Sequence, residues 1–162
     1  RPTTTDVPTP TAATYTPGAS RNDHMRVRFS EILERLDDVK AGGKTALIDH
    51  RSPEEYRGER VNMTGAPNVG AERAGRIPGA KHLYFDELLN DDMTFRDEAE
   101  LRGLLEGVGA TPDKDVISYC RLSHRATLCY FTMTQLLGYD SVRSYDGSWT
   151  EWGSLVGVPI EK

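Results

Sequence analysis

Six consecutive residues, CRLSHR at positions 120–125, combine a nucleophilic thiol with two arginines and a histidine. An apolar run typical of a buried strand precedes Cys120, and an apolar helical pattern follows Arg125. The first N–H groups of a helix have no partner within the helix and carry positive partial charge. We therefore expect the loop backbone to stabilise a thiolate, or an anionic sulfur attached to Cys120, with Arg121, His124 and Arg125 adding charge at the rim.

Two other interpretations of Cys120 are open. A cysteine in a strand is more often a small buried hydrophobe, although Cys120 ends the strand and does not lie inside it. Cysteine phosphatases bind phosphate oxygens with the pattern Cys-x5-Arg, but the sixth position after Cys120 is Ala126, and the basic residue comes one place early at Arg125. A loop one residue shorter forms a narrower cradle, which suits a single sulfur better than a tetrahedral phosphate.

Further polar residues follow a second apolar run, at 45–48. Asp49 and Arg51 come directly after it, where Arg51 can attract an anionic substrate and Asp49 can orient that substrate or the loop. A structural ion pair between the two is an equal alternative. The second cysteine, Cys129, lies within the apolar helical pattern, so we expect it in the core. The histidines have no metal-ligand spacing, and we predict neither a metal nor a cofactor.

The elements that position these residues alternate along the chain. Apolar runs predict strands at 45–48, 82–84, 116–119 and 142–145, and helical spacing predicts helices that begin at Ser30, Ser52 and Asp97 and one at 126–137. This order predicts an α/β fold with a mainly parallel sheet of about five strands and helices on both faces. Right-handed crossovers then place every strand-to-helix loop at one edge of the sheet.

Length and composition bound the organisation of the chain. Its 162 residues fit one domain, at 25–162, preceded by an extended Thr- and Pro-rich tail at 1–24 that we interpret as a linker. Two cysteines exclude a disulfide scaffold, and a net charge of −5 argues against nucleic-acid binding through bulk charge. No apolar run approaches the roughly 20 residues of a membrane helix. We therefore expect a cytoplasmic protein that binds neither membrane nor nucleic acid.

Four stretches together resemble the rhodanese family, specifically the C-terminal catalytic half of tandem-domain thiosulfate sulfurtransferases. They are LIDHRSPEEY at 47–56, AGRIPGA at 74–80, the loop at 120–125 and YDGSWTEW at 145–152. The resemblance implies that Cys120 takes the outer sulfur of thiosulfate as a persulfide and passes it to cyanide or another thiophilic acceptor. It further implies that the backbone of Arg121, Leu122, Ser123, His124 and Arg125 cradles the persulfide, and that the Arg121 side chain binds the donor.

The resemblance leaves alternatives and departures. The donor could be 3-mercaptopyruvate, the acceptor could be a protein, and some rhodanese-like domains only bind partners. A second, N-terminal rhodanese domain is an expected partner, and the long polar loop at 58–76 is expected to face it. Four residues depart from the usual family pattern: a histidine is replaced by Arg76, a hydrophobic residue by His50, a loop glycine by Ser123 and a second basic residue by Glu55.

Overall fold

A computed structural model describes residues 3–18 and 22–162 of the chain. Within these residues an α/β fold surrounds four parallel strands in the spatial order β2-β1-β3-β4. The strands are β1 (Thr45–Asp49), β2 (Lys81–His82), β3 (Asp115–Tyr119) and β4 (Val142–Ser144). The α/β class and the parallel sheet are thereby confirmed. The expected count of about five strands is corrected to four, because the position beyond β4 holds only a single parallel bridge between Arg26 and Ser144.

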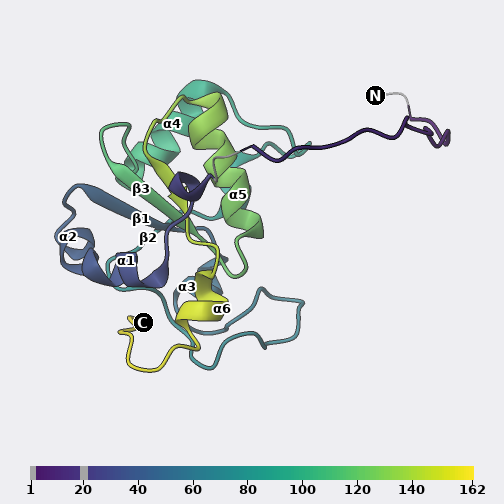
Figure 1. Cartoon of the computed structure of the whole chain (residues 1–162). Coiled ribbons are helices and arrows are strands. Elements are labelled where there is room, and N and C mark those ends of the chain that lie inside the picture. The colour runs from purple at the N-terminus through teal and green to yellow at the C-terminus, as the bar shows by residue number, and fades with distance from the viewer. Residues whose placement is uncertain (1–2, 19–21) are drawn as a thin grey trace.

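Helices cover both faces of the sheet, as Figure 1 shows. One face packs against α1 (Phe29–Glu34), α2 (Leu36–Lys40) and α6 (Ser148–Trp152), and the other packs against α4 (Glu98–Gly107) and α5 (His124–Phe131). The strands serve both layers because successive side chains point to opposite faces. In β1, Leu47 belongs to the first core and Ile48 to the second. Two buried faces explain why β1 reads as an unbroken apolar run.

Capping side chains set where several helices begin. Ser52 caps the short helix α3 (Pro53–Tyr56) and Asp97 caps α4, both as the sequence predicts. The start predicted at Ser30 is wrong: α1 begins at Phe29, with Arg28 as its cap. The backbone N–H of Arg28 donates to the Glu31 carboxylate over 3.0 Å, so an acidic residue in the first turn determines this boundary.

The apolar segment predicted as one helix at 126–137 has two parts. The helix α5 begins earlier, at His124, and ends at Phe131. A π-helical turn, η3 (Thr132–Leu136), continues it before the chain turns at Gly138. Short 3₁₀ turns, η1 (Asp23–Met25) and η2 (Phe85–Leu88), complete the helical elements of the described residues. None of these helices is long and apolar enough to cross a membrane.

The predicted tail at 1–24 is described in part. Residues 3–18 are exposed and form neither helix nor strand, and Figure 1 shows them extending away from the domain. Positions 1–2 and 19–21 lie outside the described residues. The polar loop at 58–76 contains turns and bends without a helix or strand, as its composition predicts.

Strand register determines which residues meet at the edge that carries the site. Asp49 at the end of β1 pairs with Tyr119 at the end of β3. The next residues, His50 and Cys120, therefore emerge at the same edge, where the backbone N–H of His50 donates to the Tyr119 carbonyl over 2.9 Å. Two stretches far apart in sequence thus form one site.

Candidate active site

Cys120 directly follows β3 and is almost fully buried, with 1% of its surface exposed. Its backbone is held by the segment that closes the domain. The Cys120 N–H donates to the Ser148 hydroxyl over 3.3 Å, and the Trp149 N–H donates to the Cys120 carbonyl over 2.9 Å. The closing segment therefore holds the backbone of Cys120 on both sides.

Ser148 ties together the two ends of the cysteine loop. Its hydroxyl oxygen accepts from the N–H of Cys120 and, over 3.1 Å, from the N–H of Ser123, and it donates to the Tyr145 carbonyl over 2.8 Å. One buried hydroxyl therefore fixes the width of the loop. The sequence reasoning missed this residue, and its only signal was a position within the closing motif at 145–152.

Ser123 keeps the backbone conformation that a glycine would adopt most readily. Its φ of 66° lies in the left-handed region, which costs an L-residue roughly 1–2 kcal/mol. Its hydroxyl is hydrogen-bonded to the Ser144 hydroxyl over 2.9 Å, and its backbone N–H is held by Ser148. These contacts stabilise a turn that would otherwise be strained, so the exchange of glycine for serine leaves a loop that turns sharply into α5.

The loop presents several backbone donors at the start of α5. Among the described residues, the N–H groups of Arg121, Leu122, His124 and Arg125 have no acceptor. They add to the positive end of the helix, which favours an anion at this position. The Leu122 side chain is 43% exposed and His124 is exposed, so both point outward at the rim. Of the five residues predicted to form the cradle, four have an N–H group without an acceptor among the described residues, and the N–H of the fifth, Ser123, is bound by Ser148.

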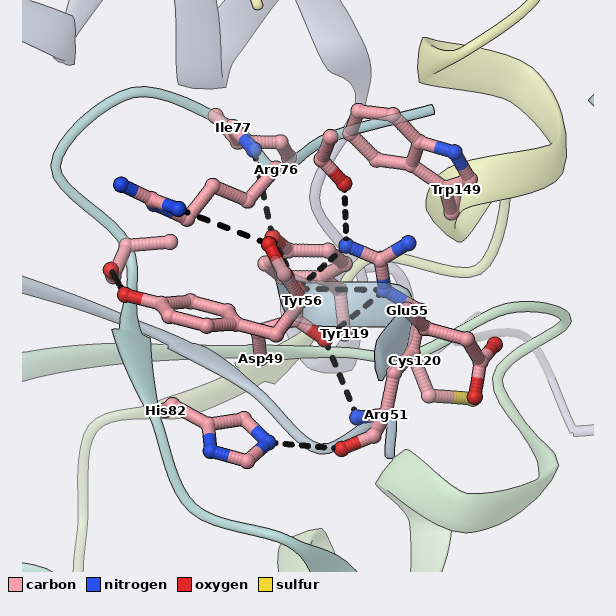
Figure 2. Close-up of polar contacts among 12 residues, drawn as sticks. Asp49, Arg51, Glu55, Tyr56, Arg76, Ile77, His82, Tyr119, Cys120 and Trp149 are labelled. Atoms are coloured by element: carbon pink, nitrogen blue, oxygen red, sulfur yellow. Dashed lines mark hydrogen bonds and ion pairs between the residues drawn. The ribbon is translucent and has the colours of Figure 1, made fainter. Parts of the chain in front are cut away.

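Arg125 is held by a carboxylate and is not a free charge at the rim. Its two terminal nitrogens donate to Glu55 over 2.7 and 2.9 Å, and Glu55 is fully buried. Burial opposes the charge of Arg125, but the Glu55 carboxylate outweighs it and keeps the pKa of Arg125 above its ordinary value. Figure 2 shows Glu55 and Cys120 on the same side of Arg51. The sequence marks Glu55 only as the place of a missing basic residue and does not predict this partner for Arg125.

Local structure explains how Glu55 reaches that position. In the capping box of α3, the Ser52 hydroxyl accepts from the Glu55 N–H, and the Glu55 carboxylate accepts from the Ser52 N–H over 3.0 Å. The side chain therefore folds back over the start of the helix toward Arg125. The same carboxylate caps α3 and orients a residue of the cysteine loop.

Asp49 and Arg51 form a second buried ion pair (Figure 2). The Arg51 guanidinium donates to both oxygens of Asp49, at distances of 2.6–3.1 Å, and both side chains are fully buried. It also donates to the Gly75 carbonyl over 2.7 Å and lies 4.4 Å from the centre of the Trp149 ring. This geometry contains the ion pair of the structural alternative, while Nη1 of Arg51 is buried and has no partner among the described residues.

Charge and hydrogen bonds keep Asp49 ionised despite its burial. Burial alone would raise its pKa, but Arg51 and the Tyr119 hydroxyl, which donates to Asp49 over 2.7 Å, hold the pKa below its ordinary value. For Tyr119, burial and the Asp49 charge raise the pKa well above its ordinary value. The neighbouring His50 is also buried, and its Nδ1 is hydrogen-bonded to the Leu83 carbonyl over 2.8 Å. Burial lowers the pKa of His50 to about 4, so its ring is neutral near pH 7.

Arg121 reaches back over the loop at 58–76. One terminal nitrogen, Nη2, donates to the Val69 carbonyl over 2.9 Å, and none of its nitrogens forms an ion pair with a described residue. Of the three arginines predicted near Cys120, this is the one whose charge has no carboxylate partner within the described residues.

The second cysteine lies in the core, where the sequence reasoning placed it. Cys129 on α5 is fully buried, both cysteines are free thiols, and burial raises the pKa of Cys129 well above its ordinary value. No group of three or more His, Cys, Asp and Glu side chains within the described residues is arranged to hold a metal ion.

Comparison with known proteins finds relatives along most of the chain. The profile of the rhodanese-like domain matches residues 30–155. The sulfur carrier protein TtuD of Thermus thermophilus is 48% identical over 166 aligned residues, which cover 100% of this chain and 56% of TtuD. A Mycobacterium tuberculosis protein, provisionally named the thiosulfate sulfurtransferase SseA, is 45% identical over 161 residues, 99% of this chain and 51% of that protein. The chain thus spans about half the length of the curated relatives it matches.

A solved structure extends the comparison to three dimensions. A variant of EanB that carries a cysteine persulfide, in a tetrahedral intermediate state with ergothioneine, superposes with a TM-score of 0.81. The two chains are 27% identical, and the match covers 97% of this chain and 36% of EanB.

Proposed function

The chain belongs to the family of rhodanese-like domains, and we propose that it is a sulfurtransferase whose Cys120 carries the transferred sulfur as a persulfide. The observation that carries this proposal is the position of Cys120 at the end of β3, beneath the donors that begin α5 and within a loop closed by Ser148. Such a cradle stabilises negative charge on one sulfur atom without a metal or a second nucleophile.

The proposed reaction has two displacements at sulfur, with thiosulfate as donor. The Cys120 thiolate attacks the outer sulfur of thiosulfate, a new S–S bond forms, and sulfite leaves with the electron pair of the S–S bond that breaks. In the second step a thiophilic acceptor such as cyanide attacks the terminal persulfide sulfur. Thiocyanate forms, and the electron pair of the broken S–S bond returns to Cys120 as thiolate.

Different residues of the site would bind the persulfide and the donor. The backbone N–H groups of the loop receive the negative terminal sulfur of the persulfide, and Ser148 keeps the loop at the width of one sulfur. The Arg121 guanidinium attracts and orients the dianionic donor. Phosphatase chemistry is disfavoured because the second arginine of the loop, Arg125, is bound on both terminal nitrogens by Glu55. It is therefore not free to bind phosphate oxygens.

A protein acceptor is the second candidate for the sulfur-accepting step. It is favoured by the 48% identity to a relative named as a sulfur carrier protein. The exposed Leu122 at the rim offers an apolar contact that cyanide does not need. The greater length of the relatives supports the proposal that a second domain accompanies this one in the whole protein.

Mass spectrometry of the chain after incubation with thiosulfate tests the proposal. We expect a gain of one sulfur atom on the peptide that contains Cys120, reversed by cyanide with release of thiocyanate. The Cys129→Ser variant is the matched control, because it removes the other free thiol and should retain the gain, whereas Cys120→Ser should lose it. Failure to gain sulfur from thiosulfate and also from 3-mercaptopyruvate, or equal gain in Cys120→Ser, would refute the assignment.

A further inference from the structure

The loop at 58–76 holds the Arg121 side chain in place through two consecutive residues, Val69 and Gly70. The Val69 carbonyl accepts from Nη2 of Arg121 over 2.9 Å. Nε of the same guanidinium is buried and has no partner among the described residues. The guanidinium is therefore held against the loop by one hydrogen bond and by van der Waals packing.

Gly70 provides the space for that packing. A Cβ atom built on Gly70 would lie 2.2 Å from Nη2, 2.9 Å from Cζ and 3.1 Å from Nε of Arg121. These distances are shorter than van der Waals contact, so the guanidinium lies directly on the glycine backbone. The φ of Gly70, 114°, is also one that side-chain-bearing residues rarely adopt. A side chain at position 70 would therefore displace the guanidinium of Arg121 from the loop.

The loop is itself anchored on both sides of Val69 and Gly70. The Asn68 side chain accepts from the Val61 N–H over 2.8 Å. On the other side, the Trp149 indole N–H donates to the Arg73 carbonyl over 3.0 Å, which ties the loop to α6 (Figure 1). An anchored loop therefore gives the side chain that directly follows the reactive cysteine a fixed place.

We propose that Val69 and Gly70 form a positioning seat that fixes the Arg121 guanidinium for an anionic sulfur donor, with Gly70 as a determinant of donor affinity. The proposal rests on the proposed sulfurtransferase function. An unrestrained arginine loses side-chain entropy when it binds an anion, and a side chain that is already fixed loses less. Nη1 of the guanidinium, which has no acceptor among the described residues, is then presented to the donor in one orientation.

Gly70→Ala tests the seat, and Gly65→Ala is its matched control. Gly65 lies in the same loop with a φ of 86°, and nothing lies within 4 Å of a Cβ added there. Both substitutions add one methyl group to a glycine of positive φ, but only Gly70→Ala displaces Arg121. Relative to Gly65→Ala, we expect Gly70→Ala to raise KM for thiosulfate about 3- to 10-fold with little change in kcat, the cost of ordering one long side chain.

A double-variant comparison separates the seat from general damage to the loop. In an Arg121→Gln background, Gly70→Ala should add no further increase in KM, because the group it displaces is gone. Thermal unfolding should show the two alanine variants within a few degrees of each other. Thiosulfate affinity measured by calorimetry in a Cys120→Ser background provides a readout without turnover, and the dissociation constant should rise by the same factor as KM.

Different experimental outcomes would refute the seat and the proposed function. If the unsubstituted chain forms the Cys120 persulfide but Gly70→Ala and Gly65→Ala have equal KM and equal affinity, the seat is refuted and the function stands. The seat is also refuted if Gly70→Ala raises KM equally with and without Arg121, or if Cys120→Ser protein binds no thiosulfate. If neither thiosulfate nor 3-mercaptopyruvate forms a persulfide, the function itself fails.

Discussion

Replacing Asp49 by Asn should destabilise the domain more than any surface substitution. The amide that replaces the carboxylate is neutral, so the Arg51 guanidinium would remain buried without its counter-charge. Asp49 accepts from the Arg51 side chain, the Arg51 backbone N–H and the Tyr119 hydroxyl, so the loss affects the whole strand-edge network. The structure also gives the sign of the pH dependence: a carboxyl with a lowered pKa stabilises the fold above its ordinary pKa, and this stability is lost in acid.

The magnitude follows from complete burial of both partners. Removing one partner of a buried ion pair costs about 3–5 kcal/mol. In a domain of this size, 1 kcal/mol corresponds to a change in Tm of about 2–4 °C, so Asp49→Asn should lower Tm by about 6–20 °C. The exposed pair of Glu98 and Arg102 on α4, whose atoms approach to 2.8 Å, is the control. Glu98→Gln should cost no more than about 0.5 kcal/mol.

Urea unfolding at pH 7 and thermal scans of the two variants measure these losses. A third variant, Asp49→Asn with Arg51→Met, should recover part of the stability, because it no longer leaves a cation buried without a partner. Its KM for thiosulfate should equal that of the unsubstituted chain, since the Arg51 guanidinium is already bound by Asp49 and by the Gly75 carbonyl. A loss in Asp49→Asn no larger than in Glu98→Gln would refute the reasoning on stability. A raised KM in the double variant would restore Arg51 as a donor-binding residue.

Three further predictions follow from the site. His50→Asn should remove a pH dependence of the stability. In the unsubstituted chain, His50 binds a proton below about pH 6.5 when unfolded but only below about pH 4 when folded, so the free energy of unfolding falls by roughly 3 kcal/mol as the pH falls through this window. Urea unfolding of both proteins from pH 7.5 to 4 measures the difference. Ser148→Ala should lower the free energy of unfolding by about 1–3 kcal/mol, measured by thermal unfolding, because two buried N–H groups lose their acceptor. It should also reduce the rate of persulfide formation, and an unchanged rate would refute the role of Ser148 in shaping the loop. Glu55→Gln should leave the charge of Arg125 without its carboxylate partner and so lower KM for thiosulfate, with a smaller effect at high salt. If KM changes neither with the substitution nor with ionic strength, this account is refuted.

The sequence predicts the elements better than it predicts the pairing of charges. Apolar runs predict the two central strands, β1 and β3, closely, because strands buried on both faces need apolar residues. The edge strand β2 is only Lys81–His82 and shares just His82 with the predicted run at 82–84. The capping residues Ser52 and Asp97 predict helix starts because their partners lie three residues away. Glu55 and Arg125 are 70 residues apart, and only the fold brings them together. No local sequence pattern predicts such a pair. The sequence therefore suggests that the charge of Arg125 is free, whereas in the structure it is paired with the Glu55 carboxylate.

The same limit applies to the hydroxyl groups around the loop. Ser123 departs from the usual glycine, which suggests a changed backbone, yet Ser144 and Ser148 stabilise the left-handed turn. Those serines come from β4 and from the start of α6, and their roles depend on the β3–β4 register. The position of Cys120 is predictable from its strand and helix, whereas the geometry of the loop depends on contacts that the linear sequence does not contain.

Carboxylates pair with two of the three arginines near Cys120, so only part of the positive charge remains unpaired. Three arginines surround Cys120, but Arg51 is paired with Asp49 and Arg125 with Glu55, which leaves Arg121 and the α5 N-terminus to attract an anion. Under the proposed reaction both the donor thiosulfate and the product sulfite are anions, and groups that bind both equally do not accelerate the chemical step. Under that reaction, three free arginines would also bind sulfite more tightly and slow its release. Under the same proposal, one positioned arginine beside a cradle for a single sulfur would attract the donor and still release the product.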